Sequence, residues 1–311
     1  MKLIKKHIVA IALLSCSLGI AQQLPQFTQY MYNTISINPA YAGSRETLSV
    51  VGLHRSQWVG FKGGPITQTL SVHSPLKNEK MGLGLSFIND KLGYQDFSYV
   101  YADFSYTINT GEKTKLAFGL KGGLTKYSLS SNLRGSEPDD PAIYGVEDRW
   151  SPNIGVGFFW HSQKWYLGLS APRILNTNTN KEGNSGGVQY KALERISYYI
   201  TGGYVIDIGE STKFKPAALI KATNGAPLSY DLTANFLFFE KLWLGASYRI
   251  NNYTSALGGI VDFQISKPIR IGYAYEFPLS DIKDYSGGSH EILLIFEIFK
   301  TNKRIKSPRY F

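Results

Sequence analysis

Hydrophobic and polar side chains alternate with a period of two through most of the chain between Thr47 and Phe299. Around residues 228–238, for example, Leu232 and Phe236 fall on one face while Asp231 falls on the other. This alternation is typical of β-strands, whose successive side chains point to opposite faces. The predicted strands lie near 47–57, 65–75, 80–90, 96–109, 113–127, 150–162, 163–171, 194–207, 212–224, 228–239, 240–252, 253–265, 268–278 and 289–299.

Many regular strands can form either a soluble β-sandwich or a closed barrel. The length of the predicted strands decides between these two folds. Strands of globular proteins average about five or six residues, whereas a strand tilted across a bilayer needs about nine to eleven. The segments above have nine residues or more. We therefore predict an all-β fold, a transmembrane outer-membrane β-barrel of about 14 antiparallel strands over residues 47–299.

The two faces of the predicted strands differ in the way a barrel requires. One face carries Leu, Ile and Val with aromatic residues towards the strand ends, which suits contact with outer-membrane lipid. The other face is rich in Gly, Ser, Thr and Asn and carries charges. We expect these charges to face the lumen: Asp103, Lys121, Asp231, Arg249, Asp262, Arg270 and Glu276.

The N-terminus reads as a secretory signal peptide over residues 1–21. Lys2, Lys5 and Lys6 form its positive end, and a short apolar stretch and small residues before Gln22 follow. The alternative is a lipoprotein signal, because Cys16 ends a loose lipobox; Leu14 fits that motif poorly. Both predict export. Residues 22–46 then form an N-terminal segment packed at or in the barrel, and residues 300–311 a basic C-terminal tail.

The composition agrees with an exported barrel and argues against a disulfide-stabilised protein and against a nucleic-acid-binding protein. The chain has 21 Tyr, 17 Phe and 31 Gly but a single cysteine, so the part after residue 21 contains no disulfide. Its formal net charge of +10 falls to about +7 without the three signal-peptide lysines. Because the remaining Lys and Arg gather at turns and in the tail rather than along one strand face, the charge does not indicate nucleic acid.

The sequence contains few candidates for catalytic, metal-binding or phosphate-binding residues. The histidines after the signal lie on separate strands without metal-ligand neighbours: His54, His73, His161 and His290. No nucleophile elbow is present, and the pairs Gly82/Gly84 and Gly155/Gly157 have no following helix or lysine to bind a phosphate. Glycine in such strands favours barrel curvature or close packing by a plug. We therefore expect no enzyme activity, no cofactor and no metal.

Two motifs resemble a known family. Asn38-Pro39-Ala40-Tyr41-Ala42-Gly43 is followed by Arg55-Ser56-Gln57-Trp58-Val59-Gly60-Phe61, with Pro65 shortly after and Tyr310-Phe311 at the end. Together they resemble the PorP/SprF family of Bacteroidetes outer-membrane proteins, associated with type IX secretion and gliding motility. The resemblance gives a structural or partner-contact role to these motif positions: Asn38, Pro39, Ala40, Gly43, Arg55, Gln57, Trp58, Gly60 and Pro65.

The resemblance implies a non-enzymatic barrel of the cell outer membrane that works with type IX secretion components or with a secreted cell-surface adhesin carrying a C-terminal signal domain. It does not separate the machinery branch from the partner-anchoring branch. From the residues alone, Asn38-Pro39 also reads as a turn and Trp58 as an interfacial anchor. Two other functions stay open: a small-solute channel lined by the lumen charges, and a soluble surface β-sandwich such as a lectin.

Overall fold

The computed structural model describes residues 25–129, 149–175, 195–299 and 310–311. The predicted signal peptide with Cys16, the stretches 130–148 and 176–194, and tail residues 300–309 lie outside the described residues. Among the residues described, no helix is long and apolar enough to cross a bilayer.

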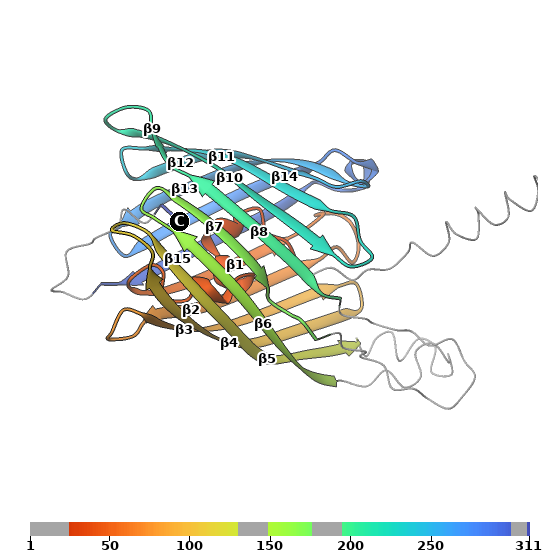
Figure 1. Cartoon of the computed structure of the whole chain (residues 1–311). Helices are drawn as coiled ribbons and strands as arrows, with labels where there is room; N and C mark the ends of the chain where they lie inside the picture. Colours follow the sequence, from red (N-terminus) through yellow and green to blue (C-terminus); the bar gives the residue numbers. More distant parts are fainter. Residues whose placement is uncertain (1–24, 130–148, 176–194, 300–309) are drawn as a thin grey trace, which may run out of the picture.

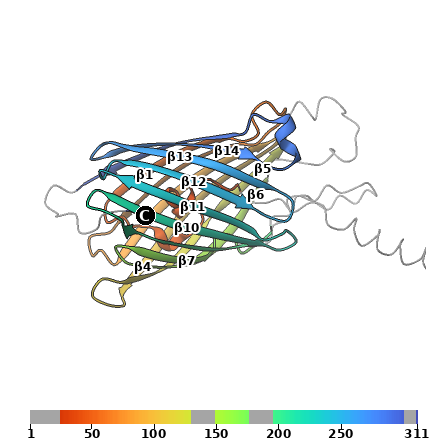
Figure 2. The same cartoon turned by 90° about the horizontal axis from the view of Figure 1, so that it is seen from above.

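The described strands form one antiparallel sheet that closes on itself (Figures 1 and 2). Apart from β8 and β9, which both pair with β10, each strand pairs with its neighbours in sequence; β10 also pairs with β11, and β15 pairs with β1. The strands are β1 Leu48–Ser56, β2 Ile66–Pro75, β3 Met81–Leu92, β4 Gln95–Asn109, β5 Lys115–Leu129, β6 Arg149–His161, β7 Trp165–Ala171, β8 Ser197–Tyr204, β9 Ile206–Asp207, β10 Thr212–Thr223, β11 Ser229–Phe238, β12 Leu242–Ile250, β13 Ser255–Ser266, β14 Ile269–Pro278 and β15 Ser289–Ile298.

The closed sheet confirms the prediction of about 14 antiparallel strands. The predicted segment 194–207 is interrupted at Val205, so that β8 and the two-residue β9 pair with the same neighbour, β10, and make a single barrel strand. Long apolar side chains cover the outside: Leu85 is 63% exposed and Leu120 60%. An outer face this apolar requires lipid rather than water around it.

The two ends of the barrel differ in their connections. At one end, short turns join the strands, as in the β11–β12 hairpin, where Phe239 and Glu240 both adopt positive φ and Lys241 N donates to Phe238 O (3.0 Å). The other end carries the connections 57–65 and 279–288, the latter with the 3-10 helix η5 Asp281–Tyr285, and the strand ends Leu129, Arg149, Ala171 and Ser197 also lie there. We call these the short-turn end and the long-loop end. In outer-membrane barrels short turns face the periplasm and long loops the exterior.

The core of the molecule lies inside the ring. Residues 25–47, which we call the plug, precede β1 and contain three short 3-10 helices: η2 Tyr30–Tyr32, η3 Thr34–Ser36 and η4 Pro39–Tyr41. Most plug residues are buried and the others are half-buried. Figure 1 shows these turns, in red, within the barrel. A barrel of this size encloses enough space for a folded segment.

Candidate functional site

The plug crosses the lumen from one end to the other. Near the long-loop end, Gln26 donates to Asp231 and to Ser229 at the start of β11. At the short-turn end, Thr47 Oγ1 donates to the carbonyl oxygen of Ile298, the last residue of β15 (2.5 Å). Contacts with the inner wall occur along the whole path between these points.

An ion-pair cluster holds the plug near the long-loop end. Arg55 of β1 lies 2.5 Å from Glu291 of β15 and 3.0 Å from Glu276 of β14. Arg249 of β12 bridges Glu276 (3.0 Å) to Asp231 of β11 (2.5 Å). Buried charges are tolerated only when each is paired and hydrogen-bonded, and this cluster meets that condition by joining strands on both sides of the β1–β15 seam.

The same carboxylates bind the plug backbone. Glu291 accepts hydrogen bonds from Thr28 N (2.5 Å) and Gln29 N (3.0 Å), and Glu276 accepts one from Thr28 Oγ1 (2.9 Å). Arg55 Nη1 also donates to Thr28 Oγ1 (3.0 Å). Backbone N–H groups of an irregular buried segment need partners, and here the wall carboxylates supply them.

A second set of polar contacts fixes the middle of the plug. Tyr32 donates to Asp262 (2.6 Å), whose carboxylate lies 3.7 Å from Arg270. On the opposite wall Lys121 lies 2.7 Å from Asp103, its direct cross-strand partner, and donates to the carbonyl oxygen of Ile35 (3.2 Å). Each of these wall charges therefore has a partner on the wall, on the plug or on both.

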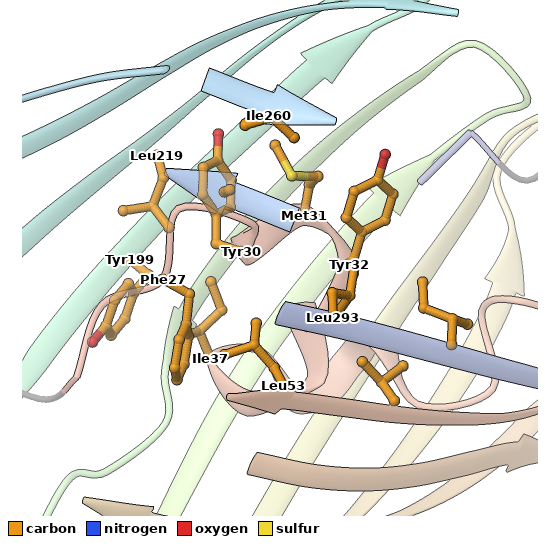
Figure 3. Packing of buried hydrophobic residues seen from close by; sticks show 13 residues of the cluster. Phe27, Tyr30, Met31, Tyr32, Ile37, Leu53, Tyr199, Leu219, Ile260 and Leu293 are labelled. Carbon is orange, nitrogen blue, oxygen red and sulfur yellow. The ribbon is translucent and has the colours of Figure 1, made fainter. Parts of the chain in front are cut away.

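Apolar side chains of the plug fill the space between these polar contacts. Figure 3 shows Phe27, Met31 and Ile37 packed among wall residues Leu53 and Leu293. The whole cluster is buried and draws on many strands: Phe27, Tyr30, Met31, Tyr32, Ile37, Val51, Leu53, Tyr199, Leu219, Ile260, Ala274, Leu293 and Ile295. At this level the lumen is packed like the core of a globular protein rather than filled with water.

Asn38 fixes the turn at η4. Its Oδ1 accepts from Ala40 N (3.0 Å), which caps the 3-10 turn that Pro39 begins, and its Nδ2 donates to Phe158 O on β6 (2.9 Å). Ala40 is completely buried. The Asn-Pro-Ala part of the motif therefore combines a local cap with a tight wall contact.

Glycines on the inner wall make room for this turn. A Cβ on Gly119 would lie 2.1 Å from Ala40 N, one on Gly157 2.1 Å from Asn38 Oδ1, and one on Gly82 2.2 Å from Ala42 O. The plug therefore lies directly against the backbone of β3, β5 and β6. This close packing matches the plug alternative that the glycine-rich strands suggested.

The plug leaves the lumen beside the seam between the first and last strands. Gly43, at φ 77°, a conformation that favours glycine, donates from its N–H to His73 Nδ1 (3.1 Å). Arg45 then pairs with Glu297 near the end of β15 (2.5 Å). Glu46 pairs with Lys115 (2.6 Å), which ties the exit to β5.

The other family-motif residues lie at the opposite end, in the loop between β1 and β2. Trp58 adopts φ 54° and Gly60 φ 93°. Gln57 Oε1 accepts from Arg55 Nε (3.5 Å), and Gln57 N donates to Pro65 O (2.8 Å). The motif is thus split: Arg55 points into the ion-pair cluster, while Trp58 and Gly60 shape the outer loop. The bond between Arg55 and Gln57 connects the two parts.

The structure brings the predicted lumen charges together in three groups rather than in one row. Asp231, Arg249 and Glu276 belong to the long-loop cluster, Asp262 and Arg270 to the Tyr32 contact, and Asp103 and Lys121 to the Ile35 contact. Several buried charged residues of equal importance were not singled out by sequence reasoning: Arg45, Lys215, Lys221, Glu291 and Glu297. All but Arg45 lie at polar positions of a predicted strand, so the alternation already indicated that these four side chains point into the lumen.

No group of His, Cys, Asp or Glu suited to hold a metal ion occurs among the described residues. A cavity of about 640 Å³ opens at the short-turn end. It is lined by plug residues, by the turns 78–80 and 162–163 and by residues 106–115. We find no constellation of catalytic side chains in the described part of the chain.

Comparisons with known proteins agree with this architecture. The family model described as "Type IX secretion system membrane protein PorP/SprF" matches residues 19–296. The chain belongs to the PorP/SprF family. This confirms the resemblance drawn from the two motifs and, with the closed barrel and its apolar outer face, places the protein in the outer membrane. A comparison with curated proteins finds no match.

Solved structures with a similar shape are outer-membrane proteins. The Acinetobacter baumannii outer membrane protein Omp33 is 11% identical, with a TM-score of 0.47, over 81% of this chain and 98% of that one. The CymD monoaromatic hydrocarbon channel is 11% identical, with a TM-score of 0.49, over 90% and 93%. The KdgM porin is 8% identical, with a TM-score of 0.40, over 81% and 99%. These likenesses are too distant to inform function.

Proposed function

We propose that this PorP/SprF-family barrel is a non-enzymatic component of type IX secretion that supports the secretion or surface anchoring of partner proteins, of the gliding-adhesin type. The observation that carries the proposal is the plug. It runs through the lumen and is fixed at both ends: Thr28 N and Gln29 N donate to Glu291, which is paired with Arg55, and Arg45 of the plug pairs with Glu297. A barrel filled in this way offers its rims and loops, rather than its interior, to partners.

The plug also weighs against the alternative of a small-solute channel. A diffusion channel needs an aqueous lumen, and lumen charges in such a channel face water. Here Lys121, Arg249 and Arg270 lie beside Asp103, Asp231 and Asp262, and plug atoms bind several of the same groups. The charges that the channel hypothesis required are used to hold the plug.

The β1–β2 loop supports partner contact at the long-loop end. Val59 and Phe61, in this loop, are each 44% exposed. The backbone of Val59 holds the loop against the neighbouring connection: its N–H donates to Gly288 O, and its carbonyl accepts from Gly287 N. The positive φ of Trp58 is a strained conformation for a bulky residue, and such strain gathers at functional positions. A rigid loop with exposed apolar side chains suits a protein partner.

Deleting the gene and comparing secreted and surface-exposed proteins tests the proposal. We expect loss of particular surface proteins, restored by the wild-type gene, with uptake of small solutes unchanged. A normal secretome together with normal motility would refute it. Purification from the outer membrane in mild detergent then separates the branches: a large cell-surface protein indicates the anchoring branch, and periplasmic secretion components indicate the machinery branch.

Planar-bilayer recordings decide the channel alternative. We expect the purified wild-type barrel to be electrically silent and a variant lacking residues 25–46 to conduct. Steady conductance by the wild-type protein would favour the channel and contradict a permanently filled lumen.

A further inference from the structure

Tyr310 and Phe311 lie inside the barrel at its short-turn end, and the C label falls within the outline of the barrel in two views turned by 90° (Figures 1 and 2). Tyr310 packs in a buried cluster with Val205, Leu237 and Trp243. The ring of Phe311 lies 4.8 Å from that of Tyr166. It contacts both the Tyr310 cluster and a second cluster that contains plug residues, so it joins the wall to the plug.

Two buried cations bind the backbone of this pair. Lys215 Nζ donates to Tyr310 O (2.8 Å), and Arg45 Nη1 donates to the backbone oxygen of Phe311 (2.6 Å). Lys215 is 1% exposed and Arg45 6%. The ammonium of Lys215 otherwise lies over the rings of Trp243 (4.5 Å) and Tyr32 (4.9 Å), which attract a cation but accept no strong hydrogen bond. The Tyr310 carbonyl satisfies a donor that burial would otherwise leave costly.

The tyrosine side chain is recognised as well. Lys213 Nζ lies 5.5 Å from the centre of the Tyr310 ring. Burial raises the pKa of the Tyr310 hydroxyl, although Lys213 opposes the shift. The pair is therefore bound through two backbone oxygens and two rings, with apolar, aromatic and cationic groups each matched to one part of it.

The site opens to a cavity, and its occupant also contacts the exit of the plug. The cavity of about 640 Å³ at the short-turn end is lined by Arg45 and Phe311 among others, so the pair borders on open space. Arg45 belongs to the plug exit and also pairs with Glu297 of β15. Whatever occupies the position of Phe311 thus adds a further hold on the place where the plug leaves the lumen.

We infer that the short-turn end of the lumen contains a peptide-recognition site for a Tyr-Phe segment, and that the chain's own residues 310–311 occupy it and lock the plug exit. Arg45 and Lys215 bind the two backbone oxygens. Tyr166 contacts the ring of Phe311, and Trp243 and Lys213 contact the ring of Tyr310. The recognition chemistry is that of a short aromatic peptide and needs no covalent link to the rest of the chain.

Binding in trans tests this. The full-length Y310A/F311A variant removes both rings from the site and leaves its own backbone only weakly held there, and a fluorescently labelled peptide Ser-Pro-Arg-Tyr-Phe is then added to it in detergent. We expect binding to the variant but not to wild type, whose site is filled, and none for Ser-Pro-Arg-Ala-Ala. Adding Lys215→Met to the variant should weaken binding roughly tenfold or more, as the loss of one charged hydrogen bond predicts. A variant that shows the heat-modifiable migration of a folded barrel but does not bind the peptide overturns the proposal.

A crosslink in the otherwise intact chain covers the case in which the double variant does not fold. The only native cysteine is Cys16, so introduced pairs are unambiguous in the exported part. The pair Y166C/F311C should be joined by a short bifunctional thiol crosslinker, since the two side chains meet with their ring centroids 4.8 Å apart. The control pair Y204C/F311C should not, because Tyr204 is 50% exposed on the outer wall. Equal crosslinking of both pairs, or of neither, would contradict the site.

Discussion

Arg55 and Glu291 face each other across the β1–β15 seam, with their charged atoms 2.5 Å apart and each side chain only 1% exposed. The carboxylate of Glu291 also accepts the backbone N–H groups of Thr28 and Gln29. A single buried pair therefore links the first strand, the last strand and the plug. Closure of the barrel and retention of the plug depend on the same two side chains.

Replacing Arg55 with methionine should strongly destabilise the protein. The change leaves Glu291 and Glu276 buried with one cation fewer, and breaking a buried pair in this way costs about 3–5 kcal/mol. We expect a lower temperature for the heat-modifiable gel shift and faster proteolysis of the plug.

The double variant R55M/E291Q is the matched control. It removes both charges of the pair, while the glutamine oxygen still accepts a plug N–H, so it should be more stable than R55M alone. A double variant that unfolds at a lower temperature than R55M would show that the charge balance is not what holds this seam.

The barrel itself could be predicted from the sequence because strand periodicity is a local property. For the described elements, the predicted segment near 268–278 corresponds to β14 at Ile269–Pro278, and that near 289–299 to β15 at Ser289–Ile298. The break at Val205 was not predicted, because the alternation of side chains continues through it; its N–H still donates to Lys164 O (2.6 Å), next to the β7–β8 pair of Trp165 and Tyr204.

The arrangement inside the lumen depends on contacts that no local pattern contains. Asp103 and Lys121 were recognisable as inward charges, and their pairing follows from strand register. Which carboxylates would bind the plug was not recognisable, because Glu291 meets Thr28 only through the path of an irregular segment without periodicity. The return of Tyr310 and Phe311 into the lumen likewise left no signal in the alternation.

A large residue at Gly119 should displace the plug. In Gly119→Leu the new Cβ would lie 2.1 Å from Ala40 N, and backbone cannot move aside there without shifting η4. We expect increased conductance in planar bilayers and protease cleavage within residues 25–46, with the barrel still folded.

Gly259→Leu provides the control for that substitution. Gly259 lies on the exposed outer face, and a Cβ added there would have no atom within 4 Å, so leucine adds only lipid contact. Conductance and proteolysis should match wild type. If Gly119→Leu also stayed silent and protease-resistant, the close contact between η4 and β5 would be in doubt.

Substituting Asn38 with alanine should loosen the η4 turn without opening the barrel. The variant loses the cap on Ala40 N and leaves Phe158 O without its donor, an expected cost of about 2–3 kcal/mol from the cap and the unsatisfied group together. Hydrogen exchange should accelerate at residues 39–42 while strand amides stay protected. Asn78→Ala removes a similar cap in an exposed turn and should change exchange only locally; equal effects of both would show that wall contact adds nothing.

The path of the plug predicts that residue 25 faces the cell exterior. Gln26 binds Ser229 and Asp231 at the long-loop end, whereas β1 begins at the short-turn end, so the chain upstream of β1 must traverse the membrane inside the barrel. Pro25→Cys and Tyr285→Cys, the latter at a 70% exposed loop residue, should react with a membrane-impermeant maleimide in intact cells. Glu240→Cys, in a short turn, should react only after lysis. Labelling of Glu240→Cys but not Pro25→Cys in intact cells would reverse the orientation and place the start of the plug in the periplasm.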